Sequence, residues 1–209
     1  MYPVLNLPFA GDTSTCALIS KAKKVKFDAH GPYQRRTYRT RTTILSPSGP
    51  LDVSIPVHTG HSLMYKDALL NYETDWDRQL LYALKTAYNS SPFYEFMQDD
   101  ISAVFGKRHK FLWDLNMDLF ETVARLINIP IDVSETTEFC KVGQDEKDYR
   151  IAIEPKYAHI LHNDSHPVTY HQVFSQPYID RPFTPYLSVL DLIFNMGCES
   201  RDVLRHMAL

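Results

Sequence analysis

The sequence predicts an α/β fold: a mixed sheet with an N-terminal strand–helix–strand unit, a β-hairpin and a central helical group. Three observations predict it. Apolar runs near residues 2–9 and 25–28 enclose a segment with helix-capping residues. Alternating runs flank a Pro/Gly turn at residues 46–50. Apolar residues then recur at helical spacing between residues 76 and 128. The 209 residues, 44% of them hydrophobic, suit a single domain spanning 1–209.

The N-terminal unit indicates a pair of parallel strands. Residues 2–9 are predicted as a strand, and Asp12, Thr13 or Ser14 can cap a helix that runs through Ala22. Residues 25–28 are predicted as the next strand. A strand, a helix and a strand within about thirty residues are typical of a βαβ start.

The hairpin follows a polar, basic stretch. Residues 41–45 and 51–57 flank the sequence Ser-Pro-Ser-Gly-Pro, a strong turn signal. Residues 68–72 are expected to add a further short strand.

Three central helices are predicted. Thr74 can cap the first, whose apolar positions are Trp76, Leu80, Leu84, Ala87 and Tyr88. The pair Ser91-Pro92 suits the start of the second, which ends at Gly106. The third covers about residues 110–128 and ends before Pro130.

The last third of the chain has a weaker pattern. Residues 131–153 are predicted as short strands around a polar loop at 143–148, and residues 154–185, with five prolines, as mostly loop. Thr184 and Pro185 are expected to open a helix that ends at Gly197, and a short helix follows Glu199.

Charge is unevenly distributed along the chain. Residues 21–41 carry eight cationic side chains and one acidic one, Asp28, whereas the rest has 14 basic and 24 acidic residues. This acidity disfavours a nucleic-acid partner, because a duplex groove requires a broader basic face.

Composition also bears on the compartment. No apolar stretch is long enough to span a membrane. The cysteines Cys16, Cys140 and Cys198 are scattered, without a CxxC pair, and residues 1–9 lack the features of a signal peptide. We therefore expect a cytoplasmic protein.

The main candidate site is the segment 30–41. Arg35, Arg36, Arg39 and Arg41, together with two tyrosines, follow directly after a predicted strand. Ligands of α/β folds bind outside the carboxyl ends of strands, and a guanidinium grips phosphate or carboxylate through two hydrogen bonds. If the segment is extended, Arg36 points away from the other three. The alternative is a solvated basic loop.

Isolated polar residues give further candidates. Asp28 and His30 can form an acid–base pair beside the basic segment. Asp191 lies in an apolar run with Asn195 on the same helical face, so it either pairs with an arginine of that segment or lies on an exposed stripe. Lys156 stands among aromatic residues and is a further candidate; the alternative is ordinary packing in a loop.

The histidines are a weaker candidate. His159, His162, His166 and His171 surround Asp164, but turn-forming residues interrupt them and no HExxH pattern occurs, so a polar loop is favoured over a metal site. No P-loop, GxGxxG or GxSxG motif is present. The sequence assigns no metal and no particular cofactor, and it does not fix an oligomeric state.

The order of several segments resembles the WbqC-like protein family. The resemblance rests on residues 33–41 (YQRRTYRTR), 54–57, 66–67, Trp76, 87–95 (AYNSSPFYE), 111–116 (FLWDLN), 170–174 (YHQVF) and 187–197 (LSVLDLIFNMG). It implies an acyl- or aminoacyl-transferase of surface-polysaccharide biosynthesis, of the O-antigen and lipopolysaccharide type. The substrate would be an amino sugar that is anionic and nucleotide-linked.

Combined with this resemblance, the concentrated charge suggests roles for the candidate residues. The four arginines bind the anion, Tyr33 orients the sugar or base, and His30 or Asp28 takes the proton from the attacking amine. The other expected ligand-binding residues are Tyr38, Lys66, Lys156, Asp191 and Asn195. The alternative is a non-catalytic module that binds an anionic ligand or partner.

Overall fold

A computed structural model describes residues 1–58, 64–139, 142–151, 154, 156–158, 161–162, 166–175 and 182–207. Its main sheet has four parallel strands in the order β5-β2-β1-β6. The strands are β1 (Tyr2–Leu5), β2 (Lys24–Phe27), β5 (Asp132–Glu135) and β6 (Glu146–Asp148). The α/β class and the parallel N-terminal pair are thus confirmed.

The strand order places β1 at the point where the chain reverses direction across the sheet. From β1 the chain moves to β2 and then β5 on one side, and it returns to β6 on the other side. Val4 is paired with Lys26 of β2 and with Asp148 of β6. The strand β1 ends at Leu5, earlier than predicted, and further along the predicted strand the Phe9 N–H bonds to the carbonyl of Tyr38 outside the sheet. Likewise, half of the predicted polar loop at 143–148 is the strand β6.

The helix α1 (Thr13–Lys21) connects β1 to β2. Asp12 is its cap, since Oδ1 accepts a hydrogen bond from the Thr15 N–H at 2.7 Å. The hairpin of β3 (Arg41–Ser46) and β4 (Gly49–Ser54) forms a two-stranded sheet of its own. Gly49 closes the turn with φ +118°, a conformation that favours glycine.

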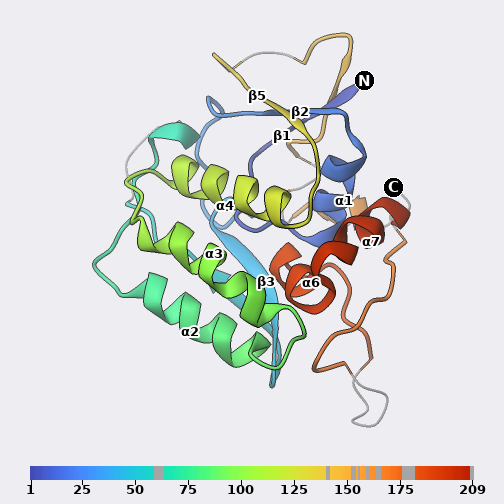
Figure 1. Cartoon of the computed structure of the whole chain (residues 1–209). Helices are drawn as coiled ribbons and strands as arrows, with labels where there is room; N and C mark the ends of the chain where they lie inside the picture. The colour runs from blue at the N-terminus through green and yellow to red at the C-terminus, as the bar shows by residue number, and fades with distance from the viewer. Residues whose placement is uncertain are drawn as a thin grey trace.

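The central helices are α2 (Trp76–Tyr88), α3 (Tyr94–Gly106) and α4 (Leu112–Leu126). Figure 1 shows α4 next to the sheet, with α3 and then α2 farther away. The ring of Phe120 on α4 meets that of Phe27 on β2 edge to face, with centroids 5.1 Å apart. The five apolar positions predicted for the first helix are all buried.

Three predicted helix starts are wrong. Asp75, not Thr74, precedes α2. Residues 91–93 form a turn before α3, and the Tyr94 N–H bonds across this turn to the carbonyl of Ser91 at 3.2 Å. The C-terminal helix α6 (Val189–Met196) begins after Ser188, because the Ser188 hydroxyl accepts the Leu190 N–H, rather than at residue 184.

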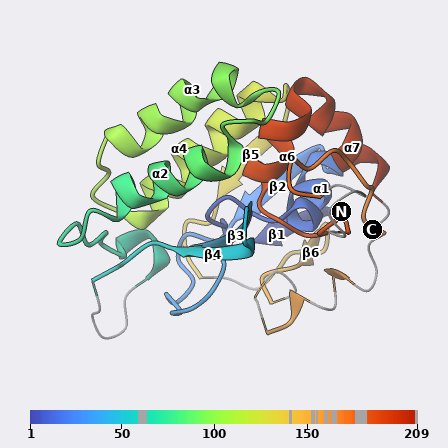
Figure 2. The ribbon, with the colours of Figure 1, turned by 90° about the horizontal axis from the view of Figure 1, so that it is seen from below.

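The C-terminal segment continues through η3 (Gly197–Glu199) into α7 (Ser200–His206), which packs on α1. A 3-10 turn, η1 (Tyr65–Asp67), precedes the isolated bridges of Leu69 and Leu70 that replace the short strand predicted there. Figure 2 shows the hairpin beside α2. Among the described residues, no helix has both the length and the apolar character needed to cross a bilayer.

Candidate anion-binding site

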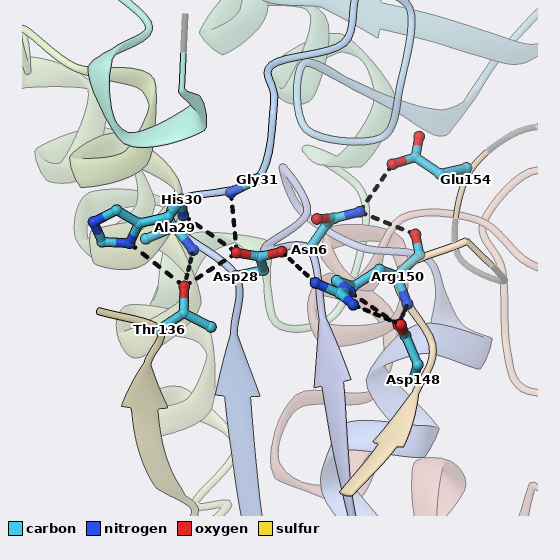
Figure 3. A network of polar contacts seen from close by, with 9 residues as sticks. All are labelled: Asn6, Asp28, Ala29, His30, Gly31, Thr136, Asp148, Arg150 and Glu154. Atoms are coloured by element: carbon cyan, nitrogen blue, oxygen red, sulfur yellow. Dashed lines mark hydrogen bonds and ion pairs between the residues drawn. The ribbon is translucent and has the colours of Figure 1, made fainter. Parts of the chain in front are cut away.

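Polar residues gather above the carboxyl ends of all four parallel strands. Asn6 follows β1, Asp28 follows β2, Thr136 follows β5, and Asp148 ends β6. Figure 3 shows these residues above the tips of arrows that point the same way. The boundary between β1 and β6 is the place where the strand order reverses, and open α/β sheets bind ligands at such a point.

Asp28 is the centre of this group and is only 1% exposed. Its Oδ1 accepts hydrogen bonds from the backbone N–H groups of His30 (3.2 Å) and Gly31 (3.0 Å) and from the Thr136 hydroxyl (3.1 Å). Its Oδ2 pairs with Nη1 of Arg150 at 2.8 Å. Both carboxylate oxygens are therefore engaged, which suits a residue that positions the strand ends.

The imidazole of His30 does not contact the Asp28 carboxylate but joins it through Thr136. Oγ1 of Thr136 donates its proton to Asp28, so it accepts from Nδ1 of His30 at 3.5 Å. Nε2 of His30 then accepts from Nζ of Lys66 at 2.8 Å. His30 lies on the β5 side of Asp28, whereas Arg150 and Glu154 lie on its β6 side (Figure 3). The two expected catalytic residues thus share a network, but not as a direct acid–base pair.

Arg150 links the ends of β2 and β6 across β1. Besides Asp28 it binds Asp148 in a bidentate manner, through Nε at 3.0 Å and Nη2 at 2.7 Å. These hydrogen bonds lower the pKa of the Asp148 carboxyl. Asn6 adds a link by donating from Nδ2 to the Arg150 carbonyl at 2.9 Å.

The basic segment is not extended, although an extended backbone was the condition for its arginines to alternate between two sides. Residues 35–40 form turns, and Arg36 has φ +59° in the left-handed region. As a result, Arg35, Arg36, Thr37 and Arg39 line the same cleft, and the condition under which Arg36 would point away from the other arginines is not met.

Arg39 forms the buried part of this wall. It is 4% exposed, pairs through Nη1 with Oε1 of Glu154 at 3.1 Å, and lies over the ring of Tyr65. Burial raises the pKa of the Glu154 carboxyl, against the opposing effects of Arg39 and Asn6. Arg39 Nε and Glu154 Oε2 are buried and have no hydrogen-bond partner among the residues that the structure describes.

The cleft encloses about 600 Å³ above the strand ends, a volume typical of sites for small ligands. Its exposed cations are Arg35, Arg36 and Lys156. None of the three forms an ion pair within the described part of the chain. Three cations without carboxylate partners among the described residues surround one concave surface, which makes this cleft a candidate anion-binding site.

Several predicted residues lie outside the lining of this cleft. The guanidinium of Arg41 lies 6.0 Å from the centroid of the Tyr38 ring, and burial raises the pKa of Tyr38 to about 12. Tyr33 is half-buried against the core, and burial raises its pKa too. Lys66 is held by His30.

Asp191 and Asn195 belong to a separate buried cluster. Asp191 is 1% exposed, and its Oδ2 accepts from the Tyr170 hydroxyl (2.7 Å) and from Nε2 of Gln172 (3.2 Å). The expected arginine partner and the exposed stripe are therefore both wrong. Burial raises the pKa of Asp191 to about 6. Asn195 donates to the backbone carbonyl of Asp191 and accepts from Ser91.

The histidines do not form a shared site in the described residues. Nε2 of His162 pairs with Oδ2 of Asp12 at 2.9 Å, and its ring stacks on Tyr186. His159 and Asp164 lie outside the described residues. Within the residues that the structure covers, no group of three or more His, Cys, Asp or Glu side chains has a metal-binding arrangement.

Sequence reasoning missed four residues of the site: Asn6, Thr136, Arg150 and Glu154. Only Glu154 stands directly after a region predicted as strands; Asn6 falls inside the predicted strand 2–9 and Arg150 follows the predicted loop 143–148, so neither had the signal by which Asp28 was singled out. The partner of Asp28 is 122 residues away in the chain, and no local pattern indicates such a pairing.

The fold and the site define an α/β protein with a cationic cleft at the carboxyl edge of a parallel sheet. A sequence model of the WbqC-like protein family matches residues 16–163, more than half of the chain. The chain belongs to this family, as its segments indicated. No curated protein and no solved structure matches the chain.

Proposed function

We propose that the protein binds an anionic, nucleotide-linked amino sugar in the cleft and transfers an acyl or aminoacyl group to it, as a cytoplasmic step of surface-polysaccharide biosynthesis. One observation carries the proposal. Arg35, Arg36 and Lys156 face one cleft at the switch point of the sheet without carboxylate partners in the described residues. Membership of the WbqC-like family supports the biosynthetic context.

The charge pattern supports an anionic ligand of more than one negative charge. The chain as a whole has a net charge of −3, so three unpaired cations in one cleft run against the general balance. Guanidinium groups bind phosphate oxygens in pairs, and lysine adds a point charge that adapts to the ligand. A diphosphate linkage matches this set.

The proposed transfer forms a bond between the sugar nitrogen and the acyl carbon while the bond from that carbon to the donor's leaving group breaks. The amine must lose a proton in this step. Glu154 lines the cleft with a raised pKa, and its Oε2 has no hydrogen-bond partner among the described residues; in this proposal Glu154 takes the proton, which requires the buried Oε2 to turn toward the bound amine. In this proposal Asp28 fixes Arg150, and His30 is a positioning residue through Thr136.

Binding without turnover is the second candidate. It is favoured because hydrogen bonds and an ion pair already occupy both carboxylate oxygens of Asp28, and because Glu154 is paired with Arg39. The two candidates share the anion site and differ in whether the amino sugar gains mass after incubation with an acyl-coenzyme A or an aminoacyl adenylate. Turnover that is lost in Glu154→Gln and kept in Glu121→Gln, on the exposed side of α4, supports the transferase.

Calorimetric titration of a UDP-linked amino sugar tests the anion site. We expect the Arg35→Ala/Arg36→Ala double variant to bind at least about tenfold more weakly than wild type, because each charge-assisted contact contributes about 1.5–3 kcal/mol. Arg205→Ala, an exposed arginine on α7, is the matched control and should bind like wild type. Equal affinity in the double variant and wild type, or no binding at millimolar ligand, contradicts the proposal.

A further inference from the structure

The cationic cleft has a second, apolar wall. Eight large hydrophobic side chains are exposed in the described part of the chain, and three of them line this cleft: Phe139 (63% exposed), Ile151 (63%) and Tyr157 (36%). Singly exposed apolar residues need no explanation, but a cluster in a concave surface is typical of a ligand site. The apolar wall thus borders the same cleft as the arginines.

The aromatic part of this wall is held by charged groups. The guanidinium of Arg150 lies 5.3 Å from the centroid of the Phe139 ring, and Arg150 is itself fixed by Asp28 and Asp148. Nζ of Lys156 lies 5.2 Å from the centroid of the Tyr157 ring. Phe139 therefore lies beside a guanidinium that Asp28 and Asp148 hold in place, while most of its own surface stays exposed.

The two walls require a ligand with two chemically different parts. A simple inorganic anion would leave the aromatic side chains exposed, and a purely apolar chain would offer no negative charge to Arg35, Arg36 and Lys156. A nucleoside diphosphate has a flat base for the aromatic wall and a charged group for the cationic wall. Stacking on an aromatic ring is favourable for every base, since each base has a π face.

We propose that the cleft takes a nucleoside diphosphate with its base on Phe139 and Tyr157 and its diphosphate on Arg35, Arg36 and Lys156. This inference rests on the proposed function and names its ligand class. Ile151 adds an apolar edge to the base subsite. The base is held by stacking, so uridine and adenosine diphosphates bind with similar affinity.

The test compares pyrophosphate with UDP and ADP by calorimetric titration of the full chain at one ionic strength. Wild type is expected to bind both nucleotides at least about tenfold more tightly than pyrophosphate, the scale of one base–aromatic contact. Phe139→Ala/Tyr157→Ala should lose that advantage and keep its affinity for pyrophosphate. The control, Phe96→Ala/Tyr82→Ala, removes a phenylalanine and a tyrosine that are exposed outside the cleft and should keep the advantage.

The outcomes separate this inference from the proposed function. Equal affinity of wild type for UDP and pyrophosphate overturns the base subsite and leaves the anion site standing, whereas binding of neither overturns both. Decyl phosphate, which has an apolar chain in place of a base, is compared with inorganic phosphate. If its affinity exceeds that of inorganic phosphate by as large a factor as the affinity of UDP exceeds that of pyrophosphate, the choice of a nucleotide as ligand is overturned. Phe139→Trp keeps an aromatic ring, so it should still bind UDP more tightly than pyrophosphate. Circular dichroism checks that each variant is folded. If folded Phe139→Trp binds UDP and pyrophosphate equally, stacking of the base on residue 139 is overturned.

Discussion

The link between Arg150 and Asp28 makes a quantitative prediction for Arg150→Met. The substitution keeps an unbranched apolar stem and removes the guanidinium, which leaves the Asp28 carboxylate, 1% exposed, without its only ion-pair partner in the described structure. Breaking a buried pair on one side costs about 3–5 kcal/mol. Two backbone N–H groups and the Thr136 hydroxyl still bind Oδ1 of Asp28, so we expect the low end, about 3 kcal/mol. The contact with Asp148, whose side chain is 41% exposed, adds less than about 1 kcal/mol.

Urea denaturation measures this loss, and thermal unfolding should show a fall in Tm of about 6–12 °C for a chain of this size. Arg125→Met is the matched control, because its ion pair with Asp100 is exposed (62% and 39%) and is worth only about 0.2–1 kcal/mol. Adding Asp28→Asn to Arg150→Met should restore part of the stability, since it removes the buried charge while the amide oxygen keeps the three donors. The reasoning is refuted if Arg150→Met lowers the free energy of unfolding no more than Arg125→Met does, or if adding Asp28→Asn to Arg150→Met restores none of the lost stability.

Three further predictions follow from other parts of the molecule. Burial raises the pKa of Asp191 from 3.8 to about 6, so between these pH values the folded protein binds a proton there that the unfolded chain does not. Relative to Asp191→Asn, wild type should therefore lose about 2–3 kcal/mol of unfolding free energy as the pH rises from 4 to 7. Urea denaturation at several pH values measures this, and a stability difference between the two proteins that does not change with pH would rule it out. Gly197→Ala should destabilise the protein by at least about 2 kcal/mol, because its φ is +55° and the added Cβ would lie 2.5 Å from the Phe93 ring; a Tm equal to that of wild type would show that the ring moves freely. Gly106→Ala, at the end of α3 with open space around the new Cβ, should instead raise stability by about 0.5–1 kcal/mol, and a lower Tm would disprove this.

The sequence predicted those parts of the fold that depend on local pattern. The parallel N-terminal pair, the hairpin and the buried face of α2 follow from periods of two and 3.6 residues, which are visible within short windows. The placement of β5 and β6 on opposite sides of the β2–β1 pair has no such local signal, because it pairs segments more than a hundred residues apart. Helix starts were misplaced by one to four residues where turns and bonds to distant segments preceded the helix.

The candidate site was predicted in part for the same reason. A run of arginines after a strand is a local signal, and the structure places Arg35, Arg36 and Arg39 in the cleft. The left-handed backbone at Arg36 had no signal, since glycine or asparagine usually occupies that conformation. Asp191 was recognised as an acid in an apolar run, but its partners, Tyr170 and Gln172, lie in a segment without a periodic pattern.

A crystal structure of the protein with UDP tests the central claim most directly. The account predicts density for the diphosphate with its oxygens within hydrogen-bonding distance of Arg35 and Arg36, above the ends of β1 and β6. A nucleotide bound elsewhere, or an empty cleft at saturating concentration while Arg35 and Arg36 point into solvent, would contradict it.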